Sequence, residues 1–366
     1  MRWVFFALFV VHGLIHFMGF AKAYGLAEFP QLARPISRGA GVVWLAAGLG
    51  LLAIAVLYLA APRAWWMAGF AAAALSQAVI VSSWSDAKFG TLANVAVLAL
   101  AVHGFAAEGP RSLRGEYRRG VGARSAPAVP SGPVTEADLA PLPEPVREYL
   151  RVTGAVGKPR VHRFRATWRG RIRMGPGDPW MEFTAEQVDF VDEPARFFLM
   201  KAERSGLPVD VFHAYRGGSA TMQVRLLSMV PVVDARGPDL DRAETVTVFN
   251  DLCLLAPSAL LDSRVRWEPA KAGSVRARYT AGPHTISAVL VFGEAGELLN
   301  FVSEDRMQAT PDGTGFVRRR WSTPVTDYRG FGGRRASTRG EGRWHAPEGE
   351  FVYLEIEMID LQTNQP

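Results

Sequence analysis

The sequence predicts the α+β fold class: a four-transmembrane-helix bundle followed by a mostly antiparallel β domain, built as a curved sheet or half-barrel with one or two helices. Three observations predict it. Four charge-free apolar runs fill the first 107 residues, a Gly-, Pro-, Ser- and Arg-rich stretch follows, and strand-like alternation dominates the remainder. We expect a transmembrane domain at 1–107, a linker at 108–136 and a soluble β-rich domain at 137–366.

The apolar runs have the length of membrane helices. They occupy residues 3–21, 39–62, 64–85 and 89–107, with 19 to 24 residues each. About 20 helical residues span a hydrocarbon core. A buried helix of a soluble protein would explain one such run, but four in succession favour a multi-pass membrane protein.

The positive charge belongs to the amino-terminal part. Residues 1–136 hold 11 basic and 5 acidic residues, and the remaining 30 basic and 30 acidic residues cancel. The net charge of +6 therefore comes from the membrane part, which argues against a nucleic-acid partner. The single cysteine, Cys253, excludes an intramolecular disulfide and leaves the redox compartment open.

Basic residues near helix ends indicate the orientation, because Arg and Lys favour the cytoplasmic side. We expect a bacterial inner-membrane protein with a cytoplasmic β domain. A cleaved signal peptide ending at Ala21-Lys22-Ala23 is the alternative; it would leave three helices and the same cytoplasmic carboxy terminus. With the amino terminus inside, seven basic residues lie inside (Arg2, Arg63, Arg111, Arg114, Arg118, Arg119, Arg124) and four outside (Lys22, Arg34, Arg38, Lys88).

Polar side chains recur at one depth within the apolar runs. If the midpoint of each run marks the bilayer centre, His12 lies at the centre, and His16, Gln77 and Asn94 lie about 4–6 Å toward the outside. We expect hydrogen bonds between helices here, because polar residues join helices where water is absent. His103 falls about 7 Å to the other side of the centre.

His12 and His16 are also weak candidates for a metal or haem site. Histidines four residues apart share one helix face, so they cannot ligate opposite sides of one haem iron. A zinc site would need further ligands at the same depth. We therefore expect neither a metal nor another cofactor.

Asp86 and Lys88 lie in a short loop, within WSDAKFGTLAN at 84–94. The plainer interpretation makes them interfacial charges beside the aromatic anchor Trp84. The alternative has Asp86 turning inward to orient His16, which would create a proton-sensitive site.

Strands dominate the soluble domain, after an amphipathic helix at 142–150. In 161–174 arginines alternate with Phe164, Trp168, Ile172 and Met174, which predicts a strand with one basic and one apolar face. Glu355 and Glu357 alternate in the same way, so ion pairs between strands explain the basic face without nucleic acid. Further strands are expected near 180–191, 195–202, 208–215, 220–234, 275–281, 284–292, 298–306, 316–321 and 350–360, with GEAGE at 293–297 as a hairpin loop.

One helix interrupts these strands. We expect Asp241 and Glu244 to form a capping box at its start, and Pro257 to break or restart it. A long antiparallel sheet with one apolar face and about one helix to cover it has surplus concave surface. Such a sheet closes into a barrel or holds something apolar.

Catalytic motifs are absent: the sequence has no GxSxG elbow, P-loop, dinucleotide fingerprint or HExxH. We expect no catalytic residues. Asn250-Asp251 and the run from Ser303 to Arg306 are the best polar clusters. Glu304, Asp305 and Arg306 would carry acid–base chemistry if they lined a cavity, or form a surface ion pair at the end of a strand.

Six stretches occurring in order resemble a bacterial integral-membrane family of unknown function, with an amino-terminal helical bundle and a carboxy-terminal β-rich domain. The resemblance covers nearly the whole chain and implies no known activity or site. VTVFND at 246–251 departs from the more aromatic, acidic version in some relatives. The topology of the soluble part is similar to lipoprotein-carrier half-barrels. The stretches are HGLIHFMGF, WSDAKFGTLANV, LPEPVREYL, ETVTVFNDLCLLAPSALLD, ISAVLVFGEAGELLNFVSEDR and EGEFVY.

Three functions remain open. The first is a non-enzymatic membrane protein whose β domain holds a lipid-like or other apolar ligand beside the bilayer. The second is a membrane redox or metal protein using His12 and His16, and the third is an enzyme using the 303–306 cluster. The oligomeric state is not indicated by the sequence.

The predicted topology is testable with reporters. We expect a fluorescent protein fused after Pro366 to be bright and an alkaline phosphatase fusion there to be inactive, because seven basic residues against four favour a cytoplasmic end. Active phosphatase at this position would contradict the assignment.

Overall fold

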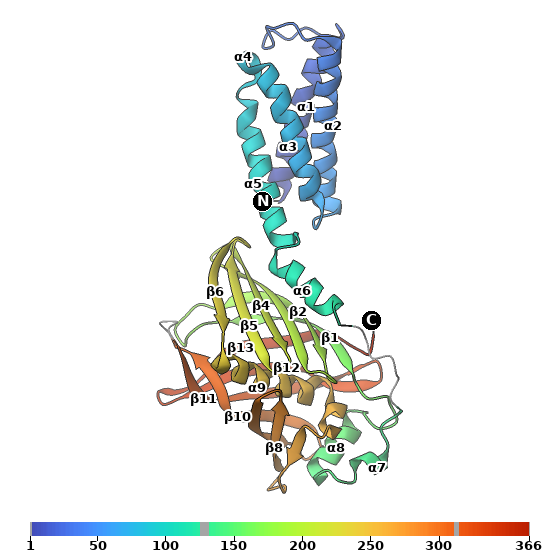
Figure 1. The fold of residues 1–366 in the computed structure, drawn as a ribbon, viewed down its shortest axis with the longest axis vertical. Coiled ribbons are helices and arrows are strands. Elements are labelled where there is room, and N and C mark those ends of the chain that lie inside the picture. The colour runs from blue at the N-terminus through green and yellow to red at the C-terminus, as the bar shows by residue number, and fades with distance from the viewer. Residues whose placement is uncertain (1, 125–131, 311–314, 366) are drawn as a thin grey trace. The chain divides into compact units, whose positions relative to one another are not determined.

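The computed structural model describes residues 2–124, 132–310 and 315–365. The chain forms two compact units, Met1–Gly115 and Glu116–Pro366, each considered by itself (Figure 1). The part of the expected linker at 125–131 lies outside the described residues.

The first unit is a bundle of α1 (Arg2–Ala23), α2 (Arg38–Ala60), α3 (Trp65–Ser82) and α5 (Gly90–Glu108). Contacts run from α1 to α2, to α3, to α5 and back to α1. All four helices are long and apolar enough to cross a membrane, as the charge-free runs predict. The short helix α4 (Trp84–Ala87) stands where a plain loop was expected.

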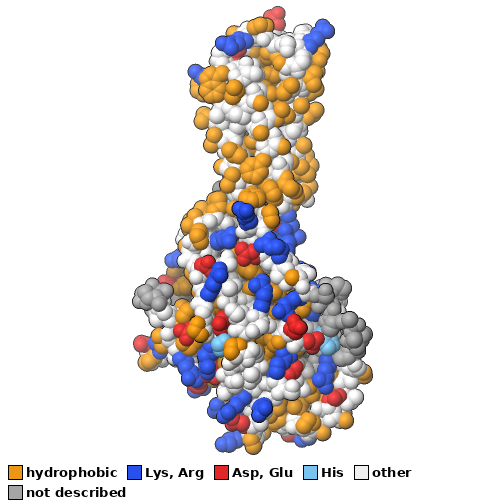
Figure 2. All heavy atoms as spheres, in the orientation of Figure 1, with side chains coloured by type: hydrophobic (Ala, Val, Ile, Leu, Met, Phe, Trp, Pro, Cys, Tyr) orange, Lys and Arg blue, Asp and Glu red, His pale blue; other side chains and the backbone are white. Residues whose placement is uncertain are grey.

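The surface of this bundle is apolar. Val4, Val56 and Leu92 are 67%, 61% and 72% exposed, and the face in view carries no charged side chain between the ends of the unit (Figure 2). Glycines let α1 and α2 pack closely: a Cβ added at Gly48 would lie 2.8 Å from the Gly13 carbonyl oxygen. Small residues thus serve the close helix packing expected in lipid.

The second unit is built on one 13-stranded antiparallel sheet, curved into a half-barrel (Figure 1). Its order is β6-β5-β4-β3-β2-β1-β13-β12-β11-β10-β9-β8-β7. The strands are β1 (Arg163–Ile172), β2 (Met181–Phe190), β3 (Ala195–Arg204), β4 (Leu207–Arg216), β5 (Ser219–Leu226), β6 (Val230–Arg236), β7 (Val265–Trp267), β8 (Ser274–Ala281), β9 (His284–Phe292), β10 (Leu298–Ala309), β11 (Phe316–Phe331), β12 (Arg334–Ala346) and β13 (Gly349–Thr363).

The expected ion pairs between strands are present. β1 pairs with β13, and Arg171 lies 2.7 Å from Glu355 and Arg169 2.8 Å from Glu357. These pairs confirm that the basic face of β1 is neutralised by its neighbour. The strand expected over 220–234 is instead two, β5 and β6, because Leu227 and Ser228 turn the chain with φ of 55° and 60°.

Three short helices flank the sheet: α6 (Leu113–Gly122), α7 (Glu136–Leu139) and α8 (Glu144–Val152). Helix α8 confirms the amphipathic helix expected to open the soluble domain. Part of the segment expected as a linker forms α6, and its residues from Glu116 onward cover the convex face of the sheet. Tyr117 there packs edge-on against Phe212 of β4, with ring centroids 6.4 Å apart.

Helix α9 (Pro238–Leu255) lies inside the curve of the sheet (Figure 1). It contacts β4, β5 and β6 toward one end of the strand order and β9, β10 and β12 toward the other, as only an enclosed helix can. The helix ends before Pro257, where the 3-10 helix η1 (Pro257–Leu261) begins, as expected.

The predicted capping box is wrong. Helix α9 begins three residues earlier, at Pro238, after Gly237 with φ of 110°. Asp241 accepts a hydrogen bond from the Ala220 amide at 2.6 Å, and Glu244 is only 2% exposed. Both side chains therefore fasten α9 to the sheet and do not cap the helix.

The main core lies between α9, α8 and strands β7 to β10. Phe249 of α9 stacks on Tyr279 of β8 with ring centroids 4.8 Å apart, and both side chains are fully buried. Tyr149 of α8 donates a hydrogen bond to the Cys253 carbonyl oxygen at 2.8 Å. The Cys253 side chain is itself 0% exposed.

Truncating the core aromatic tests this packing. We expect Phe249→Ala to lower the free energy of unfolding of the β domain by about 3–5 kcal/mol, because it leaves a ring-sized cavity against Tyr279. The control Ile359→Ala, at a position 51% exposed, should cost less than about 0.5 kcal/mol. Denaturant unfolding of the full chain in mild detergent measures both, and equal losses would contradict the assigned core.

Candidate functional site

A polar network joins α1, α3 and α5 inside the bundle. Ser76 on α3 lies at its centre: its Oγ is 2.9 Å from His16 Nε2, 3.2 Å from His12 Nε2 and 2.9 Å from Asn94 Oδ1. His12 Nε2 is also 2.9 Å from Asn94 Oδ1. All four residues are at most 5% exposed.

The network continues from Asn94 to two further side chains. Asn94 Nδ2 donates to Gln77 Oε1 at 2.9 Å, and Gln77 Nε2 donates to Thr91 Oγ1 at 3.1 Å. The hydrogen bonds expected between helices at His16, Gln77 and Asn94 are present. Ser76 and Thr91 were missed, because single hydroxyls are common in membrane helices and carry little signal.

The histidine rings are occupied by these hydrogen bonds. His16 Nδ1 lies 2.9 Å from the His12 carbonyl oxygen, which leaves its Nε2 to Ser76. His103 is nine residues from Asn94 along α5, about 13 Å of helical rise. Among the described residues no group of three or more His, Cys, Asp and Glu side chains is arranged to hold a metal ion.

Asp86 does not contact His16, so that alternative is wrong. Its Oδ2 accepts a hydrogen bond from the Arg34 amide at 2.9 Å, and its Oδ1 accepts one from Ser85 at 2.7 Å. Hydrogen bonds from Arg34 and Ser85 lower the pKa of this exposed carboxyl. Lys88 lies 5.4 Å from the Phe89 ring centroid. Asp86 thus ties the loop before α2 to α4.

The 303–306 cluster is divided between surface and interior. The Glu304 side chain is 62% exposed and 3.8 Å from Arg320, so it forms the surface ion pair of the two expected alternatives and does not line a cavity. Asp305 is buried, accepts from the Ser287 amide at 2.7 Å and pairs with Arg242 of α9 at 2.6 Å. Arg306 donates to the Ala243 carbonyl oxygen. Asp305 and Arg306 therefore hold α9 against β10.

A buried charge cluster lies between the sheet and α9. Its members are at most 9% exposed. Arg196 Nε donates to Asp251 Oδ2 at 2.7 Å, and its Nη1 lies 3.4 Å from Glu244 Oε2. Gln187 Nε2 donates to Asp251 Oδ2 at 2.7 Å and to Asp189 Oδ1 at 3.1 Å. The cluster consists of Gln187 and Asp189 on β2, Arg196 on β3, and Glu244 and Asp251 on α9.

The carboxyls of this cluster differ in the direction in which their surroundings shift their pKa. Burial alone raises the pKa of Glu244, but His213, Arg306 and Arg196 around it outweigh burial and hold that pKa well below its ordinary value. Burial raises the pKa of the Asp189 and Asp251 carboxyls, and repulsion from Asp251 at Asp189 and from Glu244 at Asp251 adds to it. Asp189 Oδ2 finds no hydrogen-bond partner among the described residues. Arg196 is thus shared by several carboxyls in a water-poor site, and Glu244 also lies beside His213 and Arg306.

Strand register places an apolar surface next to this cluster on the concave face. The row Asp189–Arg196 is followed by Gln187–Phe198–His213, then by Ala185–Met200–Val211–Val224. We call the half-buried apolar side chains here the concave apolar face. They are Trp168, Ile172, Phe198, Val209, Val224, Leu354 and Ile356, packed on the buried residues Phe183, Ala185, Met200, Ala202 and Val211.

Sequence reasoning missed most of the charge cluster, although Asn250-Asp251 was singled out. The available signal was spacing: Glu244 and Asp251 are seven residues apart, two turns on one helix face, and Gln187 and Asp189 alternate inward on β2. Assigning Glu244 to a capping box hid its relation to Asp251. Asn250 accepts a hydrogen bond from Thr323 Oγ1 at 2.6 Å and has a structural role.

Comparison with known proteins identifies the family to which the β domain is similar. A model of the family of unknown function DUF6544 matches residues 132–356, in agreement with the resemblance of the sequence motifs. No curated protein matches the chain.

Three solved structures are similar at low identity. An outer membrane lipoprotein-sorting protein domain from Vibrio parahaemolyticus is 11% identical, with a TM-score of 0.34 over 55% of this chain and 85% of that one. A DUF1329 family protein from Desulfovibrio piger is 14% identical, with a TM-score of 0.34 over 60% and 91%. A LolA superfamily protein from Nitrosomonas europaea is 10% identical, with a TM-score of 0.32 over 60% and 91%.

Removing the central cation tests the charge cluster. We expect Arg196→Met to lower the free energy of unfolding by about 3–5 kcal/mol, because it leaves the buried Asp251 carboxylate without its counterion. The loss should be larger near pH 8 than near pH 5, since carboxyls whose folded pKa is raised above the unfolded value regain stability as the pH falls through that pKa.

The control is Arg204→Met, at an exposed position of the same strand. Its effect should be within about 0.5 kcal/mol and independent of pH. A pH-independent loss for Arg196→Met in denaturant unfolding would refute the electrostatic role of this residue.

Proposed function

Because the chain belongs to the family of unknown function DUF6544, its role must be argued from its own residues, and we propose that it is a membrane-anchored, non-enzymatic protein whose β domain binds a lipid-like or other apolar ligand on the concave face of the sheet. The single observation that carries this proposal is the concave apolar face, which α9 leaves half-buried.

The physical argument is that part of the apolar area on this face remains exposed to water. Side chains such as Trp168 and Phe198 are held on a rigid sheet but are only partly withdrawn from water. Covering apolar surface is favourable by roughly 25 cal/mol per Å². A hydrocarbon chain laid along these rows would complete the burial that α9 provides at the other end of the same strands.

Charged residues lie at one end of this apolar surface only, so its two ends differ in polarity. Arg196 and His213 lie at the α9 end of the rows, and Val209 and Val224 lie further along the strands. An amphipathic ligand fits with its tail on the apolar rows and its polar end toward the buried charge cluster. Pockets of this kind are mainly apolar with few polar groups that set orientation.

The helical unit supplies the membrane anchor in this proposal. Its four apolar helices span the inner membrane, and the positive-inside pattern puts the β domain in the cytoplasm. His16, Gln77 and Asn94 then hold the helices together in lipid, where their hydrogen bonds have no water to compete with. Asp86 and Lys88 lie at the outer interface.

Photo-crosslinking tests the ligand site in the full chain. A diazirine-bearing fatty acid added to the protein in mild detergent should label peptides of β1, β3 and β13 that contain the concave apolar face. Val224→Trp fills the space over the apolar rows and should reduce this labelling at least about fivefold, because the ring occupies the ligand's volume.

Val317→Trp provides the matched control, since Val317 is 41% exposed on β11 and outside the concave apolar face. Its labelling of the β domain should equal that of the unsubstituted protein. Labelling confined to the four apolar helices, or equal labelling in both tryptophan variants, would disprove the proposed site.

A further inference from the structure

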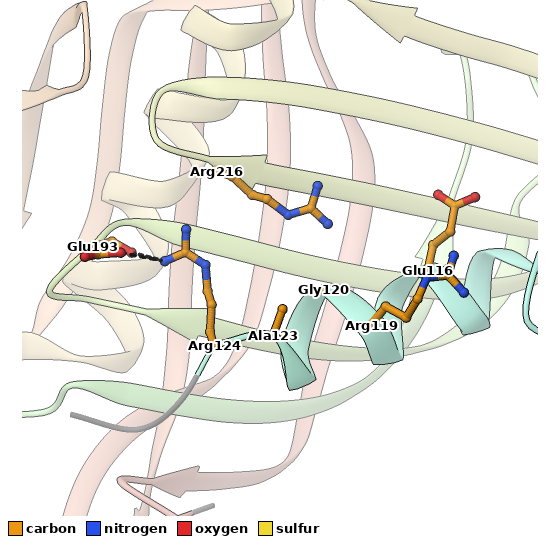
Figure 3. Close-up of a pocket in the computed structure, with 7 residues that line it drawn as sticks. All are labelled: Glu116, Arg119, Gly120, Ala123, Arg124, Glu193 and Arg216. Carbon is orange, nitrogen blue, oxygen red and sulfur yellow. Dashed lines mark hydrogen bonds and ion pairs between the residues drawn. The ribbon is translucent and has the colours of Figure 1, made fainter. Parts of the chain in front are cut away.

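A second recess lies on the opposite side of the sheet, away from the concave apolar face. This cavity of about 590 Å³ is open to solvent and lies between the end of α6, the β2–β3 turn and the end of β4 (Figure 3). Its lining includes Arg119 and Arg124 from the α6 side, Arg216 from β4, and the carboxylates Glu116 and Glu193.

The carboxylates leave positive charge in this cavity. Glu193 is paired with Arg124 at 3.5 Å, but its side chain is 89% exposed, and exposed pairs are weak. Glu116 is shared with a basic residue outside the cavity, Arg225, at 3.7 Å. Three guanidinium groups and two carboxylates therefore face the same recess.

Arg216 is held toward the cavity without an acidic partner. Its guanidinium lies 4.8 Å from the Phe197 ring centroid, and no carboxylate of the described residues is within ion-pair distance of it. Burial and the neighbouring Arg124 lower the pKa of Arg216, and Glu116 offsets them only in part. An anion bound here would offset the repulsion between Arg216 and Arg124 and compensate the cost of burying the Arg216 charge.

A glycine makes the close packing possible. A Cβ added at Gly120 of α6 would lie 2.5 Å from the Phe197 ring and 2.8 Å from a guanidinium nitrogen of Arg216. Helix α6 can therefore approach the sheet closely enough to bring Arg119 and Arg124 over Arg216 only because residue 120 has no side chain.

We propose that this cavity binds a phosphate-bearing anion, with Arg216 and Arg124 holding the phosphate. The planar guanidinium group donates two parallel hydrogen bonds to phosphate oxygens, a geometry that lysine cannot provide. The volume suits a headgroup-sized ligand. The phosphate belongs either to an anionic phospholipid or to a soluble phosphate compound.

Chain length brings a lipid headgroup within reach. Arg119 follows the last residue of α5, Glu108, by eleven positions. Eleven extended residues span at most about 40 Å. With α5 in the membrane as proposed above, this length is an upper bound on the distance between Arg119 and the end of α5, and it admits a lipid headgroup as ligand; soluble phosphate needs no membrane.

The experiment has two arms, both with the full chain in a neutral detergent. In the first, an equimolar mixture of phosphatidylglycerol and phosphatidylcholine is added, and native mass spectrometry measures which lipid is retained. In the second, inorganic phosphate is titrated by calorimetry without added lipid. Preference for phosphatidylglycerol identifies the headgroup, and phosphate binding alone identifies the soluble source.

Arg216→Gln should reduce the preference or the affinity about tenfold, because it removes charge-assisted hydrogen bonds. Arg266→Gln is the matched control: Arg266 is exposed on β7, outside the cavity, and its loss should leave binding unchanged. Ala123→Glu, which adds a carboxylate to the exposed lining, should abolish binding without touching the sheet.

Thermal unfolding checks that Arg216→Gln and Ala123→Glu are folded. If neither lipid preference nor phosphate binding is observed, or if Arg216→Gln and Arg266→Gln weaken binding equally, the proposal is overturned. A negative result for phosphate or phospholipid binding does not bear on the ligand site proposed at the concave apolar face, since fatty-acid labelling of that face is measured separately.

Discussion

The β domain depends on the neutralisation of one buried cation. Arg196 projects from β3 into the curve of the sheet, where an unpaired charge would be prohibitively costly. Asp251 and Glu244 compensate it only because they lie on one face of α9, so the ion pairs determine where that helix sits. The position of α9 in turn decides which concave rows are covered and which remain half-exposed. The buried ion pairs and the half-exposed apolar rows are thus two consequences of one contact.

The two units solve the problem of burial in opposite ways. In the helical unit the polar side chains gather around Ser76 and the apolar ones face outward. In the β domain apolar side chains fill the interior, while arginine–glutamate ladders such as Arg171–Glu355 cover an outer face. This division is the one expected of helices long and apolar enough to cross a membrane, where interhelical hydrogen bonds meet no competing water, next to a domain in which water favours apolar burial.

Sequence patterns predicted the features that repeat and missed those that depend on distant partners. The alternation around Trp168 gave β1 and its ion pairs, and the charge-free runs gave four helices. Strand β12 was missed because RRASTRGEGRWHA has few apolar residues; its pairing with β11 and β13 makes it a strand. Arg196 could not be assigned because its partners lie 48 and 55 residues away on α9. Local patterns do not encode such distances.

The reactivity of Cys253 can report on opening of the β domain. The thiol is fully buried on α9, and burial raises its pKa well above the ordinary value, so both its access to water-soluble reagents and its conversion to the thiolate are disfavoured in the folded protein. Modification at this position requires α9 to separate from the sheet. The rate of Cys253 modification therefore reports how often the half-barrel opens, and no label has to be introduced to measure it. A cysteine engineered on the surface would react much faster than Cys253, so the two reactions could be told apart.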